Sequence, residues 1–84
     1  MIITEKSNVA FMVNPHGKLF VLDRNYTKGG NTGRRTKFYK GITSYLGKGS
    51  GQIGPCVVTE HYIYNHLEEV TREIAQQMNQ LPIH

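Results

Sequence analysis

The chain has no tryptophan, one cysteine and only three prolines among its 84 residues. Since Cys56 is alone, no intramolecular disulfide can form, and a reducing compartment is expected. The first residues lack the basic start and long apolar core of a secretory signal, and no apolar run approaches the roughly 20 residues that span a bilayer. We therefore predict one small cytoplasmic domain over residues 1–84, with no membrane partner and a small core.

Acidic residues are also scarce, six against ten lysines and arginines, and none lies between Arg24 and Lys48. That stretch carries seven basic side chains, five glycines and four aromatic residues. A cationic, glycine-rich segment with flat aromatic faces is typical of polyanion-binding surfaces, although a solvated surface loop is the simpler alternative. We predict that the basic side chains of this segment bind phosphates and that two of its tyrosines stack on bases or contact sugars. The phosphate-binding residues are Lys28, Arg34, Arg35, Lys37, Lys40 and Lys48, and the tyrosines are Tyr39 and Tyr45.

The most regular pattern is a pair of short apolar runs, residues 8–13 and 18–23, separated by Asn14-Pro15-His16-Gly17. Asparagine first, proline second and glycine fourth suit a type I turn, because proline presets φ and glycine tolerates the exit. The two runs predict a β-hairpin. Core positions are expected at Val9, Phe11, Val13, Leu19, Val21, Ile42, Val57 and Val58.

Beyond the hairpin, two basic glycine-rich loops are predicted at about residues 24–37 and 47–55. Between them, residues 36–46 are rich in threonine, tyrosine and phenylalanine and partly alternate, which predicts a third strand with a bulge at Gly41. Residues 56–59 are expected to form a brief edge strand.

Residues 59–80 carry the pattern of one amphipathic helix. Its apolar residues recur at steps of three and four, its cap is Thr59 or Asn65, and Pro82 ends it. Most such stripes pack on their own sheet, but this spacing also suits a homodimer seam. The acids of this segment, opposite a basic middle, predict two differently charged faces. The stripe consists of Ile63, Leu67, Val70, Ile74, Met78 and Leu81.

The predicted architecture is α+β: a small antiparallel sheet, made of the β-hairpin plus one or two further strands, with one C-terminal amphipathic helix packed on it. The β–β–β–α order resembles that of small DNA-binding domains that present a three-stranded sheet to the major groove, such as integrase arm-binding domains. The resemblance rests on element order alone, so no residue role is transferred.

Motifs for catalysis, metals and cofactors are weak. Residues 49–54 match G-x-G-x-x-G, but a β-like run follows where the dinucleotide fingerprint needs a helix, so no cofactor is expected. His66, Glu69 and Glu73 would share one helix face, yet such residues are ordinarily solvated, and no metal is expected. Cys56 is the only nucleophile to consider, and beside two valines it is better read as a buried hydrophobe.

The leading hypothesis is a small non-enzymatic protein that binds nucleic acid, DNA or RNA, through the basic segment. A second is an inhibitor or adaptor, of the kind made by mobile elements and viruses, that docks on an acidic or nucleic-acid-binding protein. A third is a pocket for a phosphorylated nucleotide, built from the glycine loops of an oligomer. These classes differ in their expected salt dependence, stoichiometry and response to small ligands.

Overall fold

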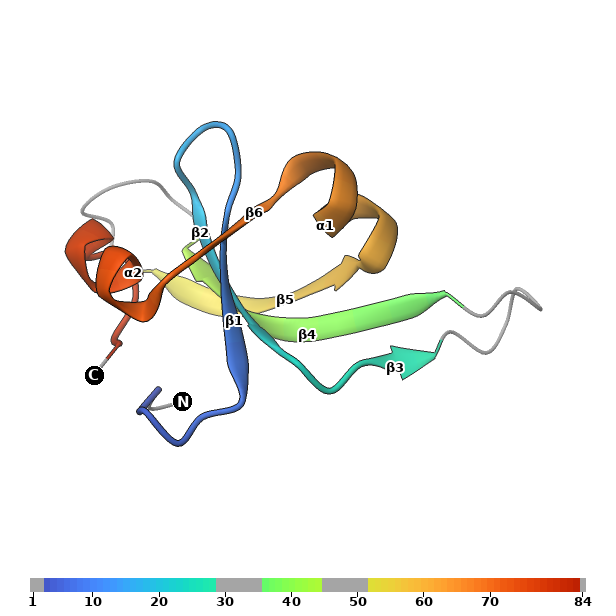
Figure 1. Ribbon diagram of the computed structural model, residues 1–84, viewed down its shortest axis with the longest axis horizontal. Coiled ribbons are helices and arrows are strands. Elements are labelled where there is room, and N and C mark those ends of the chain that lie inside the picture. Colours follow the sequence, from blue (N-terminus) through green and yellow to red (C-terminus); the bar gives the residue numbers. More distant parts are fainter. Residues whose placement is uncertain (1–2, 29–35, 45–51, 84) are drawn as a thin grey trace.

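A tight β-hairpin begins the computed structural model, which describes residues 3–28, 36–44 and 52–83 (Figure 1). Strands β1 (Val9–Val13) and β2 (Leu19–Asp23) pair antiparallel, as predicted. In the turn, the Gly17 amide donates to the Asn14 carbonyl at 2.9 Å, and Gly17 has φ +81°, which favours glycine. The Asn14 side chain also accepts from the His16 and Lys18 amides, so this hairpin is specified locally.

Strand β4 (Lys37–Ser44) confirms the predicted third strand. It pairs with β2 and with the two-residue β3 (Thr27–Lys28) on one edge, and with β5 (Ile53–Thr59) on the other. Gly41 pairs in continuous register with Leu22 and Cys56, so the expected bulge is wrong. In Figure 1 the hairpin runs across β4 and β5.

Both flanking loop predictions need correction. Thr27 and Lys28 were expected in a loop, but their pairing with β4 makes them a strand. β5 is an edge strand as predicted, yet it begins at Ile53 and contains Gly54 and Pro55. Pro55 is tolerated because an edge strand pairs on one side only. Residues 29–35 and 47–51 of the two predicted loops lie outside the described residues.

The prediction of a single helix over residues 59–80 is wrong. The segment forms α1 (Glu60–His66), β6 (Glu68–Val70) and α2 (Arg72–Met78). Its predicted cap Thr59 is correct, accepting from the Tyr62 amide at 3.1 Å, whereas Thr71 caps α2. β6 pairs antiparallel with β1 and completes a sheet of six strands. Residues 68–70 therefore form a strand, in spite of their helical periodicity, because they pair with the otherwise open edge of β1.

The element order is therefore β–β–β–β–β–α–β–α. This order removes the basis for a resemblance to three-stranded domains with one helix. The described part of the chain is an α+β domain with an antiparallel sheet and two short helices.

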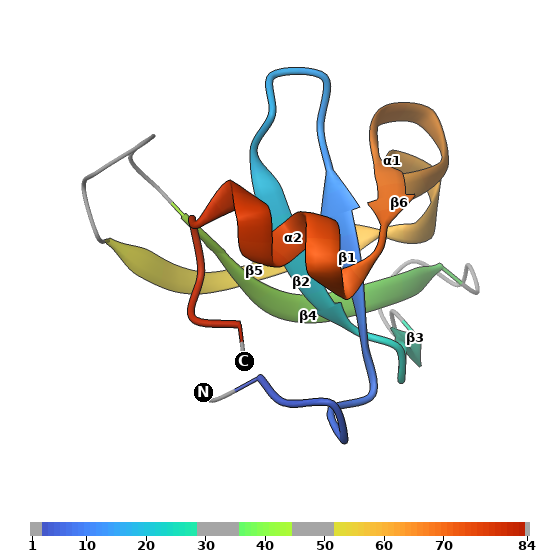
Figure 2. The ribbon, with the colours of Figure 1, turned by 60° about the vertical axis from the view of Figure 1, so that its left-hand side comes forward.

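The predicted apolar stripe is divided between two buried clusters. Leu19 and Val21 belong to one and Phe20 and Leu22 to the other, because successive side chains of a strand point to opposite faces. The first cluster also holds Phe11, Ala75 and Leu81, with Val9, Val13, Ile42, Val70 and Met78 packed against it. The second holds Val58, with Ile63 and Leu67 of the stripe against it. In the ribbon of Figure 2, α2 lies in front of β1 and β2, and α1 lies apart from it at the other end of β6.

Two predictions of buried apolar residues are wrong. Ile74 is 46% exposed, and Val57 on the edge strand is 59% exposed. Residues near the two ends of the described chain add apolar surface to the core that was not predicted. Ile3 is fully buried and forms a parallel bridge with Ile83. Gln80 links the C-terminal segment to the hairpin. Its side chain accepts from the Leu19 amide at 3.0 Å and donates to the Gly17 carbonyl at 2.8 Å.

Candidate nucleic-acid interface

Four of the eight predicted binding residues are described: Lys28, Lys37, Tyr39 and Lys40. The other four, Arg34, Arg35, Tyr45 and Lys48, lie outside the described residues. β3 and the start of β4 lie at one end of the long axis of the molecule (Figure 1).

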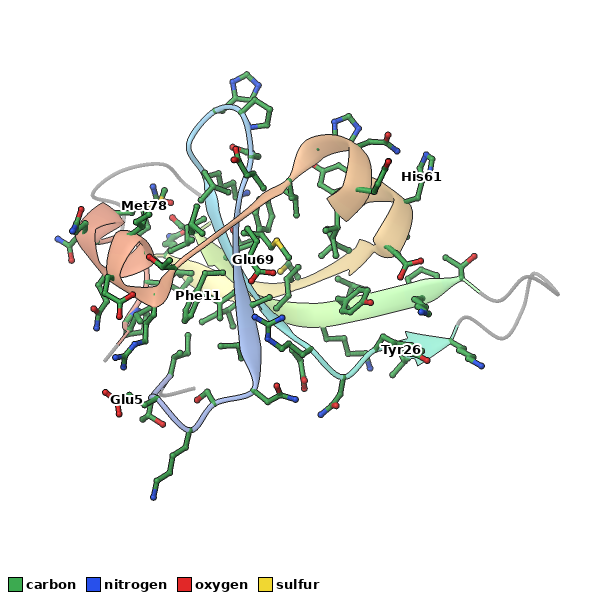
Figure 3. The ribbon with its side chains drawn as sticks, viewed as in Figure 1. Glu5, Phe11, Tyr26, His61, Glu69 and Met78 are labelled. Carbon is green, nitrogen blue, oxygen red and sulfur yellow. The ribbon has the colours of Figure 1, made fainter. Side chains whose placement is uncertain are left out.

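Lys28 and Lys37 are direct cross-strand partners at the end of the β3–β4 ladder. Like charges in this position destabilise a strand pair, so an anion between them would be favourable. The Lys37 ammonium lies 4.6 Å from the centroid of the Tyr26 ring, within range of a cation–π interaction. The Tyr26 and Tyr39 rings lie 6.1 Å apart (Tyr26 is labelled in Figure 3). The structure therefore brings two lysines and two tyrosines together.

Lys40 does not join this group. Side chains alternate along β4, so Lys40 shares a face with Ile42, which packs on the first buried cluster, whereas Lys37 and Tyr39 share the opposite face. Lys40 is exposed at its own position. A ligand on the Lys37 face would not reach both.

Acidic side chains lie next to basic ones, so the prediction of two differently charged faces is wrong for the described residues. The Glu60 carboxylate is 3.6 Å from the Lys37 ammonium and accepts a long hydrogen bond, 3.5 Å, from the Tyr39 hydroxyl. Arg24 pairs with Glu69 at 3.2 Å, and its Nε also donates to the Val9 carbonyl. These pairs are partly exposed, and such pairs are weak enough for a ligand to compete with them.

A pocket adjoins the group, where α1 faces the sheet. Its volume is about 410 Å³, within the usual range for ligand sites. Its apolar lining comes from Ala10, Met12, Leu22 and Ile63, and its polar lining from Asp23, Arg24, Tyr39, Glu60 and Tyr64. Tyr39 and Glu60 thus belong both to the pocket and to the group around Lys37.

Sequence reasoning missed most of this pocket. Glu60, Ile63 and Tyr64 stand three and four residues apart just after the Thr59 cap, so a short helix starting there places them on one face. That spacing was the available signal. The longer periodic stripe concealed it, because that stripe continues through the strand at residues 68–70.

Cys56 is half-buried, and burial raises the pKa of its thiol above the usual 9.0, although Lys18 acts in the opposite direction. The thiol is therefore protonated at neutral pH, the form that is the weaker nucleophile. It lies with Lys18, Phe20 and Tyr62 around a separate hollow of the surface.

The single helix face expected for three C-terminal residues is absent. His66, Glu69 and Glu73 fall on α1, β6 and α2 and share no helix. Throughout residues 3–28, 36–44 and 52–83, no group of three or more His, Cys, Asp or Glu is placed to hold a metal ion. Ile53 and Gly54, which end the G-x-G-x-x-G match, belong to β5 and not to a helix start.

Comparison of the chain with protein-family models, with curated proteins and with solved structures gave no match. The fold and the site geometry are therefore the basis for assigning a function. Among the described helices, none is long and apolar enough to cross a membrane.

Proposed function

We propose that the protein binds nucleic acid without catalysing a reaction, with phosphates held near the β3–β4 end. The observation that carries the proposal is the direct pairing of Lys28 with Lys37 beside the Tyr26 and Tyr39 rings. Two ammonium groups that repel each other are stabilised by a phosphate between them. Adjacent aromatic faces offer stacking surfaces, the combination used by single-strand binders.

Arg34, Arg35, Tyr45 and Lys48 extend the proposed surface on the strength of the sequence, and Lys40 would contact a ligand only from the opposite face of β4. Glu60 opposes binding, since its carboxylate already neutralises part of the charge of Lys37. A phosphate that reaches Lys37 has to compete with this exposed pair, which contributes little to stability.

The test is fluorescence anisotropy with labelled single- and double-stranded DNA and RNA at about 50 and 200 mM salt. If about four side chains contact phosphates, log affinity should fall against log salt with a slope near −3 to −4. Binding that does not depend on salt, or no binding at the lower salt, would refute the proposal.

A matched pair of variants separates the site from net charge. Lys28→Gln should weaken binding and reduce the salt slope by about 1, because one phosphate contact is lost. Lys6→Gln makes the same change of charge at an exposed position outside the basic segment. It should bind like the wild type. Equal effects of the two variants would mean that net charge alone attracts the ligand.

The alternative, an adaptor or inhibitor that docks on another protein, is favoured if nucleic acid does not bind and one protein forms a stoichiometric complex. A homodimer through the C-terminal segment would rest on Ile74, an exposed apolar residue of α2. Light scattering after size exclusion measures this, and Ile74→Lys should return a dimer to the monomer.

A further inference from the structure

The pocket between α1 and the sheet combines an apolar floor with a polar rim. Ala10 and Leu22 are buried side chains of β1 and β2 and form part of the floor, and Ile63 comes from α1. Arg24 and Glu60 stand at the rim and supply a donor and an acceptor. A nucleobase has the matching form, since its faces are apolar and its edge carries both donors and acceptors.

Tyr64 is the second feature that points to a planar ligand. It lines the pocket from α1 although the residue is 87% exposed, the highest value among the exposed large hydrophobic residues of the described chain. Tyr62, two residues earlier, is 38% exposed and packs on the His66 ring with centroids 4.8 Å apart. An open tyrosine ring at the edge of an apolar pocket provides a face on which a base can stack.

The pocket is also continuous with the proposed phosphate site. Tyr39 and Glu60 line the pocket, and the same Glu60 carboxylate lies 3.6 Å from the Lys37 ammonium. A strand whose phosphates lie at Lys28 and Lys37 would therefore present its next base to the opening between Tyr39 and Tyr64.

We propose that this pocket binds one unpaired base of a single-stranded nucleic acid, with Tyr64 stacking on it and Arg24 and Glu60 contacting its edge. The assignment rests on the nucleic-acid binding proposed above and names the form of nucleic acid that is bound, a single strand. A base within a duplex has its edge and faces occupied by pairing and stacking, so entry into the pocket would require unpairing. Single strands should therefore bind more tightly than duplexes.

The first experiment uses adenosine, guanosine, cytidine and uridine, which lack phosphate and therefore do not depend on the proposed phosphate contacts of Lys28 and Lys37. Titration into the isotope-labelled protein should shift the methyl signals of Met12, Leu22 and Ile63, which line the pocket. Ala10→Val, which adds volume to the floor, should abolish the shifts. Absence of shifts with all four nucleosides, or shifts only at residues outside the pocket, would overturn the assignment.

The second experiment compares Tyr64→Ala with Tyr62→Ala on a labelled single strand and on a duplex. Tyr64→Ala should weaken single-strand binding by about 5- to 150-fold, the range of one lost base stack, and leave the salt slope unchanged. Tyr62→Ala removes the same ring outside the pocket and should have little effect. Because Tyr64 is exposed, its replacement should leave the fold intact, and circular dichroism of each variant would check this. Equal losses in both variants, or equal affinity of the wild type for single strand and duplex, would overturn the base pocket.

The two proposals fail in different ways. Nucleoside binding without salt-dependent binding of nucleic acid would retain the ligand chemistry of the pocket and refute the phosphate surface. Salt-dependent binding in which Lys28→Gln weakens the complex but Tyr64→Ala does not would retain the surface and overturn the pocket.

Discussion

Gly41→Ala should destabilise the protein strongly, because β4 passes very close to β2 at this position. A Cβ on Gly41 would overlap the Val21 carbonyl oxygen and would lie 2.8 Å from the Leu22 Cα. Both neighbours are backbone atoms of a paired strand, so they cannot turn aside as the end of a side chain can. The methyl group is accommodated only if β2 and β4 separate.

The expected loss lies at the upper end of the usual range for overpacking, about 3 kcal/mol. A chain of this length has a total free energy of unfolding of about 4–13 kcal/mol, so the variant loses a large part of it. Such a loss corresponds to a fall in Tm of about 12–24 °C for a domain of this size. Thermal melting followed by circular dichroism and urea unfolding followed by fluorescence would measure it.

Gly17→Ala is the matched control, since it adds the same methyl group at a glycine whose Cβ position faces open space. Nothing lies within 4 Å of that Cβ, but φ is +81°, so only backbone strain of about 1–2 kcal/mol is expected. If Gly41→Ala lowers stability no more than Gly17→Ala, the close approach of β2 and β4 is refuted.

Three further predictions concern single side chains. Gln80→Leu should lower the free energy of unfolding in urea by about 1–3 kcal/mol, because it removes the side-chain hydrogen bonds to the Gly17 carbonyl and the Leu19 amide. The control Gln77→Leu changes an exposed glutamine and should alter stability little. Equal effects of the two variants would contradict a stabilising role of the Gln80 hydrogen bonds. Thr71→Ala should lower the free energy of unfolding by about 1 kcal/mol through loss of the α2 cap, and an unchanged urea midpoint would contradict it. The raised pKa of Cys56 favours the protonated folded state, so this group's contribution to stability is present below about pH 9 and lost as the pH rises through the folded pKa. Iodoacetamide should therefore alkylate the native protein more slowly than the urea-unfolded one at pH 9, and equal rates would refute the shift.

The hairpin could be predicted from sequence because its determinants are local. The Asn14 side chain binds two amides within four residues of itself, and Gly17 supplies the positive φ that the turn requires. The third strand could be predicted for a similar reason, since alternation and β-branched residues act along one segment.

The C-terminal segment could not be predicted, because distant partners decide its structure. Val70 pairs with Phe11, and Glu68 pairs with Val13, more than 50 positions away in the sequence. Helical periodicity describes only which residues are apolar. It does not show that Ile63 and Met78 pack against different clusters on opposite faces of the sheet.

The candidate site was predictable in its chemistry and only partly in its geometry. The basic stretch indicated Lys28, Lys37 and Tyr39, which the structure brings together. Sequence alone could not show that Lys40 faces the other way, or that Glu60 from a later helix would lie beside Lys37. The second depends on how α1 is placed over the sheet, a property of the tertiary structure.

The late pairing of β6 with β1 has a consequence during synthesis on the ribosome. The outer edge of β1 is complete at Val13, but its partner strand is complete only at Val70. At about 5–20 residues per second, the nascent chain keeps that edge open for roughly 3–11 s. An unpaired hydrophobic strand edge is prone to pair with other chains, so this interval is when aggregation competes with folding.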